Sequence, residues 1–144
     1  MKSIFLSKES DNMLIELSDV YKMAEYIHFY QEQHQQLSLL LIERLSAHLD
    51  FKLKIQKATV HFVKDDSFAV IGLRRSKASI FVEFHVSKFI KNPRVEKTLT
   101  GRKGQLIHRV TVHNGEDIDE TLLTWIKDSY RLNSDRSLSS HSDN

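Results

Sequence analysis

The sequence contains no cysteine, one proline and four glycines among its 144 residues. Without cysteine the chain has no thiol nucleophile, no thiolate ligand for zinc or an iron–sulfur cluster, and no disulfide that would indicate an oxidising compartment. So few glycines leave little material for a glycine-rich phosphate-binding loop. No apolar run reaches the roughly 20 residues of a membrane-spanning helix, and the run after Met1 is too short for a signal peptide. We therefore expect an ordinary globular domain located in the cytoplasm.

The charges are divided unevenly along a chain whose formal net charge is only +2. Residues 1–51 carry 4 Lys and Arg against 8 Asp and Glu, residues 52–109 carry 14 against 4, and residues 110–144 carry 3 against 7. The middle segment is basic enough to attract phosphates, acidic partners or membrane headgroups. Two interpretations stay open. Either this segment forms a functional basic surface, or acidic helices of the same chain face a basic sheet and neutralise it.

Hydrophobic periodicity predicts an α+β fold in which helices pack on an antiparallel sheet. Apolar side chains at spacings of three and four between Asp11 and Leu49 indicate two helices with a break near residues 30–35, or one bent helix. Alternating, β-branched segments predict about four strands, at 54–63, 68–74, 78–86 and 106–112. A last helix is expected to begin at a capping-box-like pair, Asp117 and Glu120, and to end near Leu132. The expected organisation is a helical extension (1–30), an α+β domain (31–133) and a disordered tail (134–144).

The register of the first three predicted strands follows from pairing Val63 with Phe68 across the turn at 64–67. This alignment places Val60, Ile71 and Val82 side by side on one face. That face is apolar over all three strands, as a sheet covered by helices requires.

The opposite face of the predicted sheet brings basic residues together. Lys57 lies across from Arg74, and Arg75 follows at the same end. Like charges directly opposite each other are destabilising, so this pair requires a bound anion or a carboxylate from an acidic helix. Phe68 and Phe81, interleaved with basic residues on this face, are typical of a platform on which bases stack, although aromatic side chains in a sheet also pack under helices. Lys57, Arg74 and Arg75 are therefore candidate ligand-binding residues.

Residues 87–105 form the most basic stretch and are predicted to be a loop. Pro93, Gly101 and Gly104 mark its bends. Such a loop either closes over an anionic ligand or is simply solvated. Arg94, beside the proline, is the fourth candidate for ligand binding.

The sequence contains no motif typical of a catalytic, metal or cofactor site, and we predict none of the three. The G-x-S-x-G, Walker, G-x-G-x-x-G and H-E-x-x-H patterns are all absent. His61, Glu83 and His85 share a face, but the first and third strands lie roughly 10 Å apart, so one ion could join these residues only with unusual side-chain reach. His108 alternates with apolar residues, which is typical of a buried core histidine. Trp125 lies beside the apolar stripe of the last helix, where it either widens the buried face or anchors a partner.

From Lys57 onward the sequence resembles a family called the domain of unknown function numbered 5655. The resemblance covers residues from about 33 to 132 and rests on the order and spacing of short motifs. These motifs are Lys57-x-x-Val60-x-Phe62, Phe68-Ala69-Val70, Pro93-Arg94-Val95, His108, Ile118-Asp119-Glu120 and Leu122-Leu123-x-Trp125-Ile126-Lys127-x-Ser129-Tyr130. The resemblance implies a compact α+β domain, found alone and as a terminal module of larger bacterial proteins, some of which look like DNA-targeting defence proteins or predicted nucleases. It implies no established reaction. The polar positions that match the family motif are Lys57 and His108, so His108 joins the candidates.

These observations favour a non-catalytic module that binds an anionic partner, a nucleic acid or a nucleotide. The candidate ligand-binding residues are Lys57, Arg74, Arg75, Arg94 and His108. The alternative is a structural or protein-interaction domain that forms a homodimer through its apolar first helix or docks on a partner protein. An enzyme is the least favoured class, and no membrane partner is expected.

Overall fold

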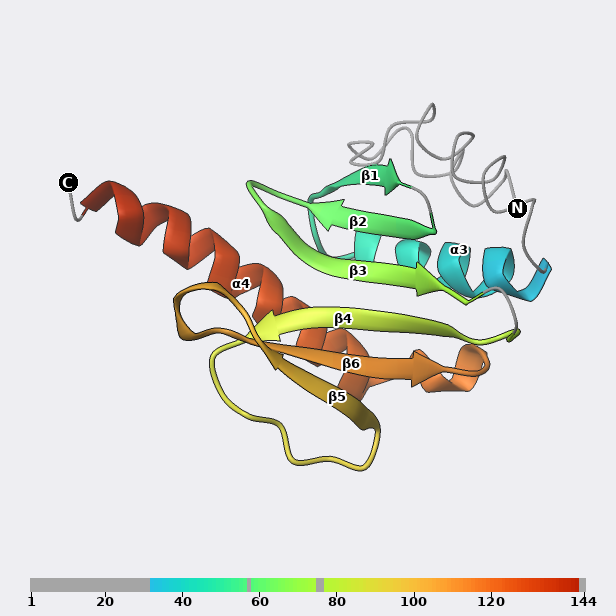
Figure 1. The fold of residues 1–144 in the computed structure, drawn as a ribbon. Coiled ribbons are helices and arrows are strands. Elements are labelled where there is room, and N and C mark those ends of the chain that lie inside the picture. Colours follow the sequence, from blue (N-terminus) through green and yellow to red (C-terminus); the bar gives the residue numbers. More distant parts are fainter. Residues whose placement is uncertain (1–31, 57, 75–76, 143–144) are drawn as a thin grey trace.

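The computed structural model describes residues 32–56, 58–74 and 77–142. In this part of the chain two helices and six strands form an α+β unit (Figure 1). The helices are α3 (Glu32–Ser46) and α4 (Glu120–Ser142), and the strands are β1 (Lys52–Gln56), β2 (Thr59–Val63), β3 (Ser67–Leu73), β4 (Ile80–Val86), β5 (Val95–Thr100) and β6 (Leu106–Val112). Short 3₁₀ turns, η1 (Arg102–Gly104) and η2 (Gly115–Asp117), precede β6 and α4. The expected helical extension, residues 1–30, lies outside the described residues.

The strands form one antiparallel sheet in the order β1-β2-β3-β4-β6-β5. The α+β class and the antiparallel sheet are therefore confirmed. The expected number of about four strands is wrong, because the described part of the chain contributes six. The two additional strands, β1 and β5, are the edges of the sheet, where polar and charged side chains are common because they discourage pairing with other chains.

The segment expected to be one strand at 54–63 is a hairpin made of β1 and β2. Ala58, in the connection between them, has φ of 64°, the left-handed conformation that a tight turn requires. In one continuous strand, the alternation that buries Val60 would also bury Lys54. In the hairpin the odd-numbered residues of β1 face the core instead, so that Leu53 and Ile55 are directed to the core and Lys54 is exposed.

The predicted register of β2, β3 and β4 is confirmed over most of its length. Val60 pairs with Ile71, and β4 aligns with β3 as expected. At the hairpin end, however, Val63 pairs with Ser67 and not with Phe68, because the register shifts at this point. Phe68 consequently points into the core and is fully buried, so its expected place on the polar face is wrong.

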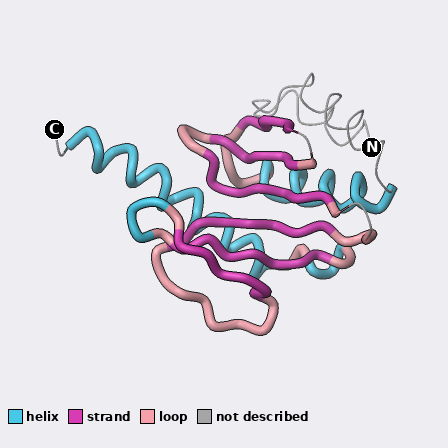
Figure 2. Tube along the Cα trace, viewed as in Figure 1, coloured by secondary structure: helices cyan, strands magenta, loops and turns pink. Residues whose placement is uncertain are grey.

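Strand β5 lies within the segment that was expected to be a loop. It pairs with β6 from Val95 opposite Val110 to Thr100 opposite Leu106. All six of its residues are exposed or half-buried, so it lacks the apolar alternation by which a strand is predicted. The remaining loop, residues 87–94, forms a long arch between β4 and β5 (Figure 2).

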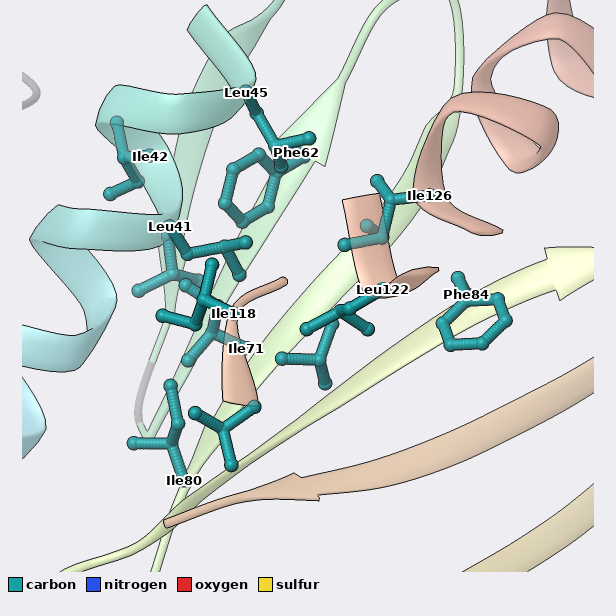
Figure 3. Packing of buried hydrophobic residues seen from close by; sticks show 14 of the residues in the cluster. Leu41, Ile42, Leu45, Phe62, Ile71, Ile80, Phe84, Ile118, Leu122 and Ile126 are labelled. Carbon is teal, nitrogen blue, oxygen red and sulfur yellow. The ribbon is translucent and has the colours of Figure 1, made fainter. Parts of the chain in front are cut away.

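Both described helices pack against the apolar face of the sheet (Figure 1). Figure 3 shows Leu41 and Leu45 of α3 beside Phe62 of β2, and Leu122 and Ile126 of α4 near the strands. The largest fully buried side chains are Phe51, Phe62, Phe68, Phe84, Leu41, Ile42, Leu45 and Ile71. At about 25 cal/mol per Å² of apolar surface, burial of this cluster is the main stabilising contribution.

Helix α4 begins with Asp119 as its cap. The Oδ1 atom of Asp119 accepts a hydrogen bond from the backbone N–H of Leu122 at 3.0 Å, which satisfies a free donor of the first turn. Asp117, the residue expected to cap, lies in η2 and accepts a hydrogen bond from the N–H of His113 at 2.8 Å. The expected capping pair is therefore wrong by two residues.

The end of α4 also differs from the prediction. The helix continues to Ser142, beyond the expected end near Leu132 and into the segment expected to be a tail. No helix in the described part of the chain is long and apolar enough to cross a membrane.

Candidate functional site

The sheet face turned away from α3 and α4 carries a line of side chains that crosses all six strands. By the strand register this line consists of Lys54, His61, Val70, Glu83, Arg109 and Lys97. We name these six residues the charged row. Successive residues of a strand point to opposite faces, so the charged row lies opposite the core, and its members are half-buried or exposed.

An aromatic ring lies next to the charged row. Phe81 pairs with Gly72 on the helix-free face, as predicted. A Cβ atom added to Gly72 would lie 1.9 Å from Cζ of Phe81, so the ring occupies the space that glycine leaves. The guanidinium carbons of Arg74 and Arg109 lie 5.2 and 4.1 Å from the ring centroid, within the range of cation–π attraction. Phe81 thus holds two arginines at one place on the sheet.

Arg74 extends across the sheet from the end of β3 to β5. Its Nη2 lies 2.6 Å from Oε1 of Glu96, and its Nη1 donates to Oγ1 of Thr111 at 3.4 Å. Burial raises the pKa of Glu96, but the hydrogen bonds from Thr111 and Arg74 together outweigh this effect. The pKa of Glu96 therefore lies below its usual value, and the carboxylate is ionised at pH 7. A bound anion or a carboxylate from a helix was expected here. The helix as the source is wrong, because the carboxylate comes from an edge strand.

Arg109 forms the second ion pair of this face. Its Nη2 and Nε lie 2.6 and 2.8 Å from Oε2 of Glu83, its direct neighbour across the β4–β6 pair. On its other side Arg109 is opposite Lys97 of β5, and like charges in this position are destabilising. Glu83 offsets that repulsion from one side, while Lys97 has no ion-pair partner among the described carboxylates.

His61 is the one histidine of the charged row. Burial lowers its pKa, the positive charge of Lys54 lowers it further, and Glu83 opposes them. The ring is therefore neutral at pH 7, and its Nδ1 lies 3.3 Å from Oγ of Ser67. Within the described residues no group of three His, Asp or Glu is placed to hold a metal ion.

A family model for a domain of unknown function, DUF5655, matches residues 23–133, more than half of the chain. The chain belongs to the DUF5655 family. The matched range contains α3, all six described strands and the first half of α4, and hence the whole charged row. No curated protein and no solved structure shows significant similarity to the chain.

The described part of this DUF5655 domain does not gather the candidate residues into one site. Lys57 and Arg75 lie outside the described residues. Arg74 lies on the helix-free face, next to the charged row. Arg94 and His108 are both associated with the helix side of the sheet.

Arg94 joins the loop before β5 to the start of α4. Its Nη1 lies 2.9 and 3.0 Å from the two carboxylate oxygens of Asp119, and its Nη2 donates to the carbonyl oxygen of Asp117 at 2.5 Å. Its guanidinium carbon also lies 6.0 Å from the Trp125 ring. These contacts use several donors of the guanidinium group and join the loop to α4. Binding of an anion by Arg94 stays a prediction.

His108 lies on the core face of β6, as predicted, with no exposed surface. Its ring stacks on Phe84, and its Nε2 accepts a hydrogen bond from the N–H of Ile90 at 3.0 Å. Burial lowers the pKa of His108, against a smaller raising effect of the Leu106 backbone. The ring is therefore neutral at pH 7 and carries its proton on Nδ1. In this position His108 anchors the 87–94 loop.

Trp125 widens the buried face of α4, one of the two possibilities considered from the sequence, and its anchoring of a partner stays a prediction. It is half-buried and stacks on Phe84 with ring centroids 5.7 Å apart. Its outer edge borders an open groove of about 400 Å³ between α4 and the start of the 87–94 loop, together with Lys88 and Arg131.

Arg109 and Glu96 were not expected on the helix-free face. A signal for Arg109 exists in the sequence, since aligning His108 with Phe84 on the apolar face puts Arg109 across from Glu83. The sequence contains no such signal for Glu96, because Glu96 reaches this face only through strand β5, which the sequence pattern does not predict.

Proposed function

We propose that this chain is a non-catalytic cytoplasmic module that binds a nucleic acid or nucleotide through the helix-free face of its sheet. The observation that supports the proposal is the excess of cations among the described residues of this face. Lys52, Lys54, Arg74, Lys97 and Arg109 lie on it, against Glu83 and Glu96. Nucleic acids are bound largely through such charges, because neutralising phosphates releases counterions.

The lysines at the two edges support the same interpretation. Lys52, Lys54 and Lys97 have no ion-pair partner among the described carboxylates. Five strand spacings of about 4.8 Å separate β1 from β5, so the face is about 24 Å wide. This width corresponds to roughly seven phosphates along one strand of duplex DNA. A strand lying across the sheet can therefore meet both edges.

The test is binding of the purified chain to fluorescent oligonucleotides of about 12 nucleotides, single- and double-stranded DNA and RNA, over a salt series. Replacing Lys54 and Lys97 together by Ala should weaken binding and reduce the slope of log K against log salt by about 1 to 2. The matched control replaces Lys88 and Lys127, which lie in the loop and on α4. The control pair removes the same charge from elsewhere and should have a smaller effect.

Two outcomes contradict the proposal. The first is no binding by the unmodified chain at low salt. The second is an equal loss of affinity in the two double variants, which would indicate non-specific attraction to the whole molecule.

A second candidate function, a protein-interaction domain, is favoured by the exposed side chain of Phe89. This residue of the 87–94 loop is 63% exposed and lines a groove of about 550 Å³ together with Pro93 and Val95. Apolar side chains of this size are common anchors of protein partners. Mass in solution at rising concentration tests the self-associating form of this candidate, because a monomer at every concentration excludes self-association.

A further inference from the structure

Arg74 and Arg109 are organised as a pair although they come from different parts of the sheet. Both guanidinium groups approach the ring of Phe81. A guanidinium group on an aromatic ring keeps its planar fork of N–H donors available at its edge, and this fork matches carboxylate and phosphate oxygens equally well. The same ring therefore contacts two groups that can bind anions.

Each of these groups is occupied by a carboxylate of the same chain. Glu96 lies 2.6 Å from Arg74, and Glu83 lies 2.6 Å from Arg109. The pairs are not sealed in the core. The side chains of Arg74 and Arg109 are 23% and 26% exposed, and that of Glu96 is 37% exposed. An external anion can therefore reach the same donors if it displaces the carboxylates.

We propose that Arg74 and Arg109 are the phosphodiester-binding residues of this face, and that Glu96 and Glu83 occupy their place as internal substitutes for phosphate. This inference rests on the proposed function. It assigns the ligand class as a nucleic-acid strand and excludes single nucleotides and inorganic phosphate as ligands at their usual concentrations.

The selectivity follows from competition within the chain. A carboxylate of the same chain competes for the guanidinium donors at an effective concentration of about millimolar or more. A single phosphate, which makes only one contact, does not displace it. A strand that also contacts Lys54 and Lys97 makes several contacts in one binding event. Only a polyanion therefore binds tightly enough to displace the two carboxylates.

The ion pairs have a competing structural explanation, in which they only hold the end of β3 to β5 and β4 to β6. The two explanations differ in what happens when the carboxylates lose their charge. If the pairs are structural, Glu83→Gln and Glu96→Gln should lower stability without any particular gain in anion affinity. If the carboxylates substitute for phosphate, the same changes should free both arginines.

The experiment compares the double variant Glu83→Gln/Glu96→Gln with the control Glu43→Gln/Glu120→Gln, whose positions lie on α3 and α4. Titrations use the 12-nucleotide DNA and RNA probes, AMP and inorganic phosphate. The first variant should bind the oligonucleotides about 5- to 10-fold more tightly and increase the salt slope by about 1 to 2. It should also gain measurable AMP binding, while the control changes less than 2-fold.

Equal gains in the two variants, or AMP binding by the unmodified chain as tight as its oligonucleotide binding, would overturn the inference. Glu96→Gln alone is the milder variant if the double variant unfolds.

Arg74→Lys/Arg109→Lys, which keeps the charge but removes the planar set of guanidinium donors, should lose the gained affinity when it is combined with the two Gln substitutions. Oligonucleotide binding that depends on Lys54 and Lys97 but is unaffected by the Gln changes refutes this inference and leaves the proposed function standing. Absence of any binding by the unmodified chain and the Gln variants refutes both.

Discussion

The hydroxyl of Ser129 joins helix α4 to the point where two central strands separate. Ala69 and Phe84 are the last pair of the β3–β4 ladder, and Phe68, which precedes Ala69, and His85, which follows Phe84, lie just beyond it. Between them lies the fully buried Oγ of Ser129, which donates to the carbonyl oxygen of Phe68 at 2.6 Å and accepts from the N–H of His85 at 2.9 Å. One side chain thus replaces a missing step of the backbone ladder.

We expect Ser129→Ala to lower the free energy of unfolding by about 1 to 3 kcal/mol, because the buried carbonyl and N–H groups of Phe68 and His85 lose their partner. Urea denaturation measures the change. Thr124→Ala, at an exposed position of the same helix, is the control and should shift stability by no more than about 0.5 kcal/mol. Equal effects of the two substitutions would contradict the bridging role.

The β1–β2 hairpin shows how one turn can change the interpretation of a whole segment. Ala58 occupies a left-handed conformation that costs a non-glycine residue about 1 to 2 kcal/mol. The turn nevertheless forms, because it lets Leu53 and Ile55 join the apolar face. The backbone strain at Ala58 is therefore offset by side-chain burial.

Relieving this strain should stabilise the hairpin. Ala58→Gly is expected to raise the free energy of unfolding by about 0.5 kcal/mol, since glycine removes the steric cost but loses more backbone entropy. Calorimetry should show a small increase in Tm. Ala69→Gly, in β3 where φ is negative, should lower Tm, and a lower Tm for Ala58→Gly as well would refute the strain argument.

The sheet divides the described part of the molecule into an apolar side that stabilises it and a side that carries the charged row. Neutral histidines lie on both sides. Burial lowers the pKa of His108 on the core side, and burial with the charge of Lys54 lowers that of His61 on the charged side. In the unfolded chain both pKa values return to about 6.5.

Stability should therefore fall as the medium becomes acidic. Above pH 6.5 both histidines are neutral in the folded and the unfolded chain, and the stability is at its full value. Below pH 6.5 the unfolded chain binds protons that the folded chain does not, so the free energy of unfolding decreases until the folded-state pKa values are passed. Urea denaturation at pH 7.5, 6.5 and 5.5 should show this decrease, and His61→Gln/His108→Gln should make it shallower. An unchanged slope in that variant would assign the effect to other groups.

The sequence by itself determined the fold class and the pairing of the central strands. Alternation of apolar residues is a local property with a period of two, and a one-residue slip would expose Val60, Ile71 and Val82 together. The same alternation predicted that His108 is buried. Membership of the DUF5655 family could also be recognised from the sequence, because the family's short motifs occur in a fixed order along the chain.

The tertiary structure alone decided the two edge strands and the ionic partners. Strand β5 has only two apolar side chains, Val95 and Leu99, and neither is fully buried, so its formation depends on hydrogen bonds to β6 and not on its own pattern. The partner of Arg74 is 22 residues away, and that of Arg94 is 25 residues away. Charged side chains carry no period that indicates a distant partner. Which cation pairs with which carboxylate, and which lysines of the described residues have no ion-pair partner, was therefore fixed only when the six strands were assembled.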